Sequence, residues 1–205
     1  MATTLYLRNT TSTYAPTAGT KSAVLPNGTD RSLTANDSLS LLSTAGESDT
    51  TVSITTAAQT AQQSGRFARF ASERLSAQSI SANTWTVYLR DIESNAFAYA
   101  YLAISAYVWR PSTSAVVGYI RDSTTVIGSE WTTNNKAVTY TFSGSAVTAQ
   151  LGDVVVFEIW YSSTQGKSNA YTVSILFDLT SYVSTPQDLS FYVEEPDRVF
   201  CWILD

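Results

Sequence analysis

The chain has 205 residues, a net charge of −5 and only 14% charged residues, against about 25% in an ordinary soluble domain. It has no cluster of Lys and Arg and no apolar run of about 18 residues, so we expect neither a nucleic-acid nor a membrane partner. The absence of histidine excludes Ser-His-Asp and Cys-His catalysis, and the single Cys201 excludes an internal disulfide. We therefore expect no metal and no cofactor.

Residues 1–49 predict an extended N-terminal arm with loops. This part is rich in Thr, Ser, Asn, Gly and Pro, and its turn signal is the segment from Pro26 to Asp30. One short strand is predicted from Thr4 to Asn9. No basic segment is followed by an apolar one, so no signal peptide is expected.

Residues 50–205 predict a β-sandwich domain that ends in a C-terminal strand. The chain contains 29 Thr and 28 Ser, and it alternates β-branched and aromatic residues with polar turns. Roughly eight strands between Thr50 and Thr180 indicate an all-β, jelly-roll-like sandwich. The strands are expected within 50–57, 66–75, 85–93, 96–109, 115–122, 126–132, 137–142, 151–163 and 170–180.

The segment from Ala96 to Trp109 alternates aromatic residues with small or aliphatic ones, so the two sets should lie on opposite faces of a strand. A strand that is apolar on both faces is typical of a covered sheet, and either the chain's own arm or another subunit could cover it. The aromatic set allows two interpretations, packing or a platform that stacks on sugar rings. The candidate glycan platform consists of Tyr99, Tyr101, Tyr107 and Trp109.

Carboxylates raise a second question. Glu158 lies in the apolar strand from Leu151 to Ser163, where a lone buried charge is costly. We expect it to pair with Arg90, Arg110 or Arg121, and a catalytic acid is the alternative. A glycosidase requires one pair of carboxylates, and the two candidate pairs, Asp91 with Glu93 and Glu194 with Glu195, are expected to be solvated.

The two ends of the chain carry the predicted interfaces. The C-terminal run VFCWIL is apolar on both faces and would form an adhesive edge if it were exposed, so we expect it to pair within the domain or with another subunit. The candidate interface residues are Leu5, Tyr6, Leu7, Phe200, Trp202 and Leu204.

Three stretches between Ala98 and Asp178 resemble structural proteins of tailed bacteriophages: AYLAISAYVWRPSTSAVVGYIRDS, AVTAQLGDVVVFEIWYSSTQG and AYTVSILFD. The resemblance implies a β-sandwich on the capsid or tail, and it carries over no functional residue. It implies a non-enzymatic capsid decoration (cement) protein on the virion exterior, made in the host cytoplasm. Its expected partners are the major capsid protein and sister copies in a homotrimer. The alternative is a carbohydrate-binding tail or fibre module whose partners are glycans.

Overall fold

The computed structural model describes residues 2–16, 39–46, 48–56, 58, 63–122, 125–163, 168–177 and 179–193. Within these residues the chain forms strands joined by turns and one short 3₁₀ helix, η2. No helix in the described part is long and apolar enough to cross a membrane. The elements are β1 (Thr4–Thr11), β2 (Leu39–Leu42), β3 (Thr50–Thr55), β4 (Ser64–Ser72), β5 (Gln78–Ile80), β6 (Thr84–Glu93), η2 (Ala96–Ala98), β7 (Ala100–Arg110), β8 (Ala115–Arg121), β9 (Val126–Ile127), β10 (Lys136–Ser143), β11 (Val147–Ala149), β12 (Val154–Ser163), β13 (Thr172–Phe177) and β14 (Tyr182–Ser184).

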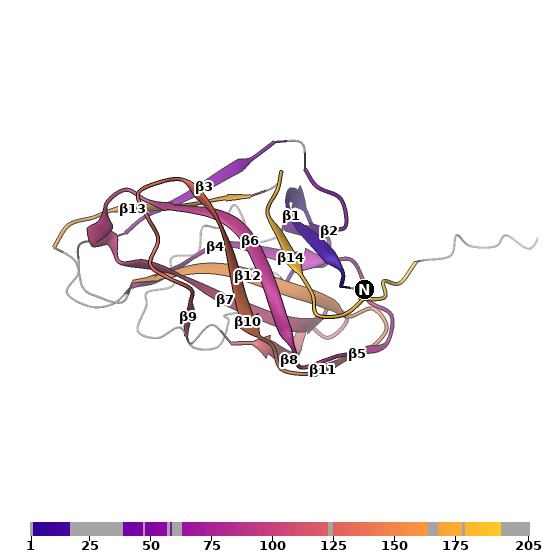
Figure 1. Cartoon of the computed structure of the whole chain (residues 1–205). Coiled ribbons are helices and arrows are strands. Elements are labelled where there is room, and N and C mark those ends of the chain that lie inside the picture. Colours follow the sequence, from indigo (N-terminus) through magenta and orange to yellow (C-terminus); the bar gives the residue numbers. More distant parts are fainter. Residues whose placement is uncertain are drawn as a thin grey trace, which may run out of the picture.

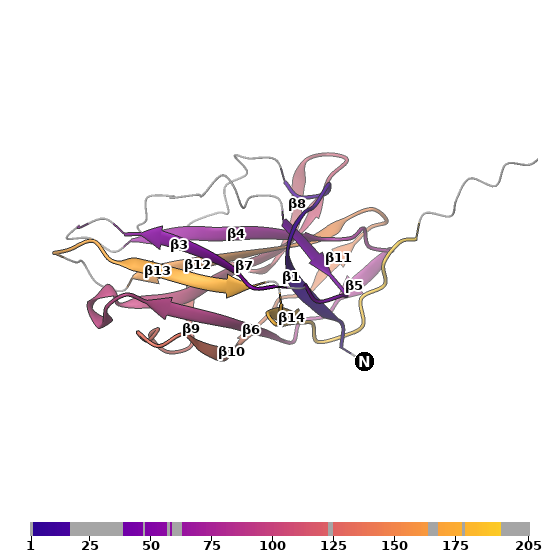
Figure 2. The same ribbon diagram turned by 90° about the horizontal axis from the view of Figure 1, so that it is seen from above.

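Most of the strands belong to one large sheet that folds over on itself. Its order is β3-β13-β6-β14-β1-β2-β4-β12-β7-β8, with β10 added to β6 and β9 added to β7. Figure 1 looks onto β6 and β10, and β4, β12 and β7 cross behind them. The turned view in Figure 2 separates these two layers. The predicted all-β sandwich is therefore confirmed.

The first strand is part of this sheet and not of a free arm. β1 pairs antiparallel with β14 on one side and with β2 on the other, and β2 continues in parallel to β4. β1 and β2 thus connect the two layers. Leu5 and Leu7 alternate along β1 and are buried in the core. The described strands on the N-terminal side of the predicted boundary at residue 49 are therefore part of the sandwich.

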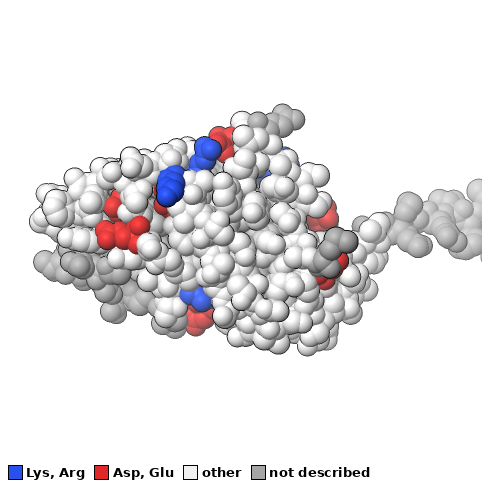
Figure 3. Space-filling view, in the orientation of Figure 1, with Lys and Arg blue, Asp and Glu red and all other residues white. Residues whose placement is uncertain are grey.

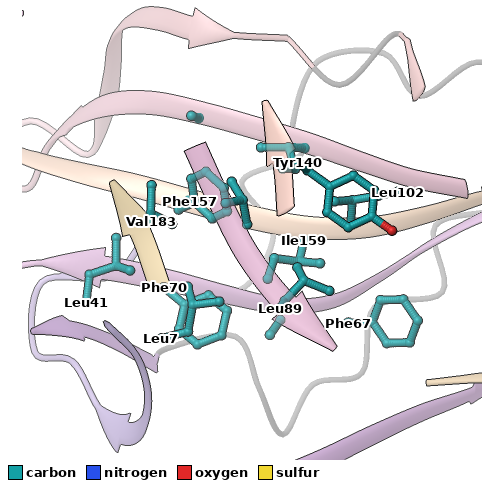
Figure 4. Close-up of a cluster of buried hydrophobic side chains, with 14 of the residues drawn as sticks. Leu7, Leu41, Phe67, Phe70, Leu89, Leu102, Tyr140, Phe157, Ile159 and Val183 are labelled. Carbon is teal, nitrogen blue, oxygen red and sulfur yellow. The ribbon is translucent and has the colours of Figure 1, made fainter. Parts of the chain in front are cut away.

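The core fills the space between the two layers. Figure 4 shows side chains from β1, β2, β4, β6, β7, β10, β12 and β14 meeting there. One face of β7 contributes the small and aliphatic set that alternates with the aromatic residues, and all of its members are fully buried. These members are Ala100, Leu102, Ile104, Ala106 and Val108. Within β7 the two sets therefore lie on opposite faces as predicted, with Tyr107 and Trp109 on the outer face. The residues from Ala96 to Tyr99 lie before this strand.

The outer face of β4, β12 and β7 is also covered. Every residue of β4 and of β12 is buried, so these strands are enclosed on both sides. A second apolar cluster lies on this face and contains Tyr107, Trp109, Val154 and Val156. Tyr14 and Ala15, which follow β1, pack against it together with Val116 and Tyr119. Part of the cover is therefore supplied by the chain itself.

Candidate functional site

A charged cluster lies on the outer face of β4, β12 and β7, and Glu158 is its centre. In the sheet register Glu158 of β12 stands opposite Arg69 of β4 and Ser105 of β7. Its Oε1 accepts a hydrogen bond from Arg69 Nε at 2.7 Å, from the Tyr107 hydroxyl at 3.1 Å and from Arg66 at 3.4 Å. Its Oε2 accepts one from Trp160 Nε1 at 3.2 Å. The Glu158 and Arg69 side chains are both 0% exposed.

These contacts explain why the aromatic row of β7 is interrupted. Ala103 stands opposite Trp160, and Ser105 stands opposite Glu158. A small residue at each of these positions leaves room for the large side chain of the neighbouring strand, because directly opposed Cβ atoms are only about 5 Å apart. The break in the row is therefore a consequence of packing across strands.

The surroundings of Glu158 keep the Tyr107 hydroxyl protonated and hold the charged groups in fixed positions. Burial and the nearby Glu158 carboxylate raise the pKa of Tyr107 far above its usual range, so its hydroxyl remains a donor. The Arg66 guanidinium also lies over the Trp160 ring, 5.4 Å from its centroid. A carboxylate that accepts bonds from four donors and has no exposed surface is an anchor for the sheet. This geometry does not suit a catalytic acid, which must reach its substrate.

The predicted partners of Glu158 were wrong. Arg110 binds Asp153 through two hydrogen bonds of 2.8 and 2.9 Å. The Arg90 Nη1 atom lies 3.4 Å from Asp49 Oδ2, and Arg121 donates a hydrogen bond to the Thr125 carbonyl oxygen. Glu158 pairs instead with residues of β4, which is about ninety positions away in the sequence. The register of β4 against β12 decides the pairing, and no local pattern reveals that register.

The structure splits the predicted glycan platform into two parts. Tyr107 and Trp109 lie in the closed outer cluster and are 2% and 3% exposed. Tyr99 ends η2 and Tyr101 lies at the beginning of β7, both at the same end of the sandwich, and both are half-buried. The four rings do not form one surface.

An open hollow lies at the η2 end of the molecule. It consists of two adjoining depressions of about 430 and 310 Å³, which share Glu130 and Thr132. Figure 3 shows acidic side chains gathered at the left-hand end of this view, near the position of η2 in Figure 1. The larger depression is lined by Glu93, Ala96, Phe97, Tyr99, Glu130, Trp131, Thr132 and Thr133. The smaller one is lined by Asp91, Gly128, Ser129, Glu130, Thr132, Lys136, Val138, Thr139 and Tyr140.

The acidic pair at this hollow was predicted to be solvated, and that prediction was wrong. Asp91 and Glu93 are 2% and 1% exposed, because β10 and the segment around Trp131 close over the end of β6. Glu93 accepts the backbone N–H of Ala100. Asp91 accepts the Tyr140 hydroxyl, and burial nevertheless raises the pKa of Asp91 to about 6. Glu194 and Glu195 lie outside the described residues.

The other predicted site residues lie as follows. Leu5 and Leu7 face the core of their own chain and are not accessible to a partner. Tyr6 is half-buried and makes an edge contact with Tyr182. Phe200, Trp202 and Leu204 lie outside the described residues. Within the described part of the chain, no group of acidic or cysteine side chains is arranged to hold a metal ion.

Sequence reasoning missed three residues of the hollow. Phe97 was counted in the aromatic row of the strand, but it lies in η2 and is 61% exposed. Glu130 and Trp131 belong to a polar connection between β9 and β10 that was read as a strand. A tryptophan flanked by Ser, Glu, Thr and Asn is a signal that could have marked this connection as a site.

The sequence matches no protein-family model and no curated protein. Among solved structures, two chains of a CocE/NonD family hydrolase from Staphylococcus aureus are similar to it, with 8% and 9% identity and TM-scores of 0.51 and 0.45. The matches cover 93% and 90% of this chain but only 36% of the hydrolase chain. A structure of infectious bursal disease virus, Gx strain, matches with 8% identity and a TM-score of 0.24, over 85% of this chain and 52% of the viral one. Only the first of these similarities carries an argument, and at 8% identity it supports the all-β sandwich fold alone.

Proposed function

We propose that this chain is a non-enzymatic structural protein of a tailed-bacteriophage virion. In this role it decorates the outside of the capsid by binding the major capsid protein and sister copies in a homotrimer. The observation that carries the proposal is the closed Glu158 cluster. The side chains that a hydrolase or a stacking platform would use on this face are all engaged in packing β4, β12 and β7 together.

The resemblance of the segment from Ala98 to Asp178 to phage structural proteins also supports the proposal. This segment contains the strands from β7 to β13, which lie in both layers of the sandwich. A buried ionic cluster within an apolar face favours one strand register over others, which suits a protein that must present a fixed outline to its neighbours. Strand pairing and apolar burial are the interactions such a protein requires.

Attachment is assigned to the C-terminal segment, because β1 is part of the sandwich. The described chain leaves the sandwich after a bridge between Leu75 and Phe191, and Val193 is 78% exposed. The apolar run that contains Phe200, Trp202 and Leu204 follows within a few residues. An apolar run can pair as an added strand with the sheet of a neighbouring chain, and this is the role we propose for it.

Edge strand β3 is a candidate acceptor. Among the described strands it pairs with β13 alone, and an edge strand is where a strand from another copy can be added to a sheet. Thr51, Ser53 and Thr55 are exposed and make the outer face of β3 polar, whereas Val52 and Ile54 face the core.

The proposal is tested by binding to particles of the phage that encodes the chain, after removal of the native copies. Full-length protein is compared with a truncation that ends at Val193 and with Trp202→Ser, and Tyr192→Ser serves as the matched surface control. We expect the full-length protein and Tyr192→Ser to rebind and to raise the temperature at which DNA is released. The truncation should stay folded and fail to bind. Equal binding by the truncation would contradict the attachment role, and no binding by the full-length protein would contradict the virion assignment.

A further inference from the structure

The hollow at the η2 end exposes a large aromatic ring beside carboxylates. Phe97 is fixed there by local structure: the Asn95 side chain accepts the Phe97 N–H at 2.9 Å, and Tyr99 ends η2 with a φ of 49°. The Phe97 and Tyr99 rings meet edge to face, with centroids 6.4 Å apart. An exposed phenylalanine is unexceptional by itself, but here its ring lines a depression that also contains the polar side chains of Glu130, Thr132 and Thr133.

Glu130 is the carboxylate of the hollow that can accept hydrogen bonds from a ligand, because Asp91 and Glu93 are buried. Glu130 is half-buried, and the hydrogen bond that it receives from the Tyr101 hydroxyl is long, at 3.5 Å. An ionised carboxylate has about four acceptor positions, so Glu130 retains capacity for further donors. Glu93 lines the same depression but is 1% exposed, and the exposed Thr132 and Thr133 add hydroxyl groups. The lining therefore offers one apolar ring face and several polar groups that converge on the same space.

We propose that this hollow binds a neutral saccharide, with the Phe97 ring stacked on the apolar face of a pyranose and Glu130 accepting hydrogen bonds from its hydroxyl groups. The larger depression, at about 430 Å³, lies within the range of small-molecule sites. The Glu130 carboxylate disfavours anionic sugars and phosphates by repulsion, and Lys136 is the only basic residue that lines the hollow in the described part of the chain. This site is separate from Tyr107 and Trp109, and it does not depend on the proposed role in a virion.

An organic cation is the alternative ligand, because carboxylates and aromatic rings also attract ammonium groups. The ring geometry favours the saccharide. A cation cage needs several open ring faces and is strongest with Trp and Tyr, whereas Trp131 is 3% exposed and Tyr99 is half-buried. One exposed ring, that of Phe97 at 61%, is sufficient for stacking against one face of a sugar ring.

The test is a titration of the full-length chain, followed by NMR, with glucose, galactose, mannose and N-acetylglucosamine as neutral probes. N-acetylneuraminic acid and tetramethylammonium serve as the anionic and cationic probes. We expect at least one neutral sugar to bind. Phe97→Ala should weaken that binding at least tenfold, Phe97→Trp should retain it, and Glu130→Gln should weaken it.

Leu151→Ala is the matched control, because Leu151 is as exposed as Phe97 but does not line this hollow. It should leave binding unchanged. The proposal would be overturned if no neutral sugar binds, if Phe97→Ala binds as the native chain does, or if tetramethylammonium binds at this hollow in preference to every sugar. Thermal unfolding of each variant shows whether a loss of binding reflects a loss of fold.

Discussion

Substitution of Glu158 by Gln removes the negative charge from the closed cluster while the side chain keeps nearly the same size. Arg69 is 0% exposed and Arg66 is 4% exposed, so both guanidinium groups remain buried when their carboxylate is lost. Breaking a buried ion pair by removing one partner costs about 3–5 kcal/mol. In a chain of this size each kcal/mol lowers Tm by about 2–4 °C. We therefore expect Glu158→Gln to lower Tm by roughly 6–20 °C.

The assay is thermal and urea unfolding followed by circular dichroism. Tyr107→Phe provides a graded control, because it removes only the 3.1 Å hydrogen bond to Glu158 and should cost about 1.5–3 kcal/mol, as for a bond to a charged group. The double variant Arg69→Met with Glu158→Leu should lose less stability than the sum of the two single variants, since it leaves fewer unpaired buried groups. If Glu158→Gln unfolds within about 2 °C of the native chain, the cluster is not an anchor and the reasoning is refuted.

Three further predictions concern other parts of the molecule. Burial raises the pKa of Asp91 from 3.8 to about 6, so its carboxyl group holds a proton more tightly in the folded chain than in the unfolded chain. The free energy of unfolding should therefore fall as pH rises from 3.8 to about 6, and Asp91→Asn should lack this fall. Urea unfolding at several pH values measures the effect, and the same pH dependence in both chains would show that the reasoning is wrong. Gly128 and Gly152 both have positive φ, but only a Cβ at Gly128 would meet the Tyr140 ring, at 2.5 Å. Gly152→Ala should therefore cost about 1–2 kcal/mol and Gly128→Ala clearly more, and equal losses of Tm would count against this. Asp153 accepts two hydrogen bonds from Arg110 and one from the Gln150 N–H, so Asp153→Asn should lower stability by about 1–3 kcal/mol in urea unfolding, and an unchanged midpoint would speak against that role.

The strands were predictable because their side chains alternate with a period of two. The segment from Ala96 to Trp109 indicates a strand with two different faces, and β7 shows both. The first residues of that segment, however, form η2 and a positive-φ residue at Tyr99, where the aromatic spacing continues without a strand. Periodicity alone does not reveal such a break, because the side-chain pattern is unchanged across it.

The contacts between distant strands were not predictable from local pattern. Glu158 meets Arg69, and Leu5 and Leu7 become core residues, only because particular strands pair in particular registers. Asp91 and Glu93 are buried because the connection that carries Trp131 covers them, and their own sequence neighbourhood looks like an exposed strand end. The candidate site was thus recognised in its residue types but not in its position.

The most direct test of the account is cryo-electron microscopy of purified particles of the phage that encodes this chain, with the protein located by its sandwich-shaped density. The account predicts that this density lies on the outside of the capsid, in contact with capsid subunits and with sister copies. Absence of the protein from purified particles, or its presence on the tail alone, would contradict the account.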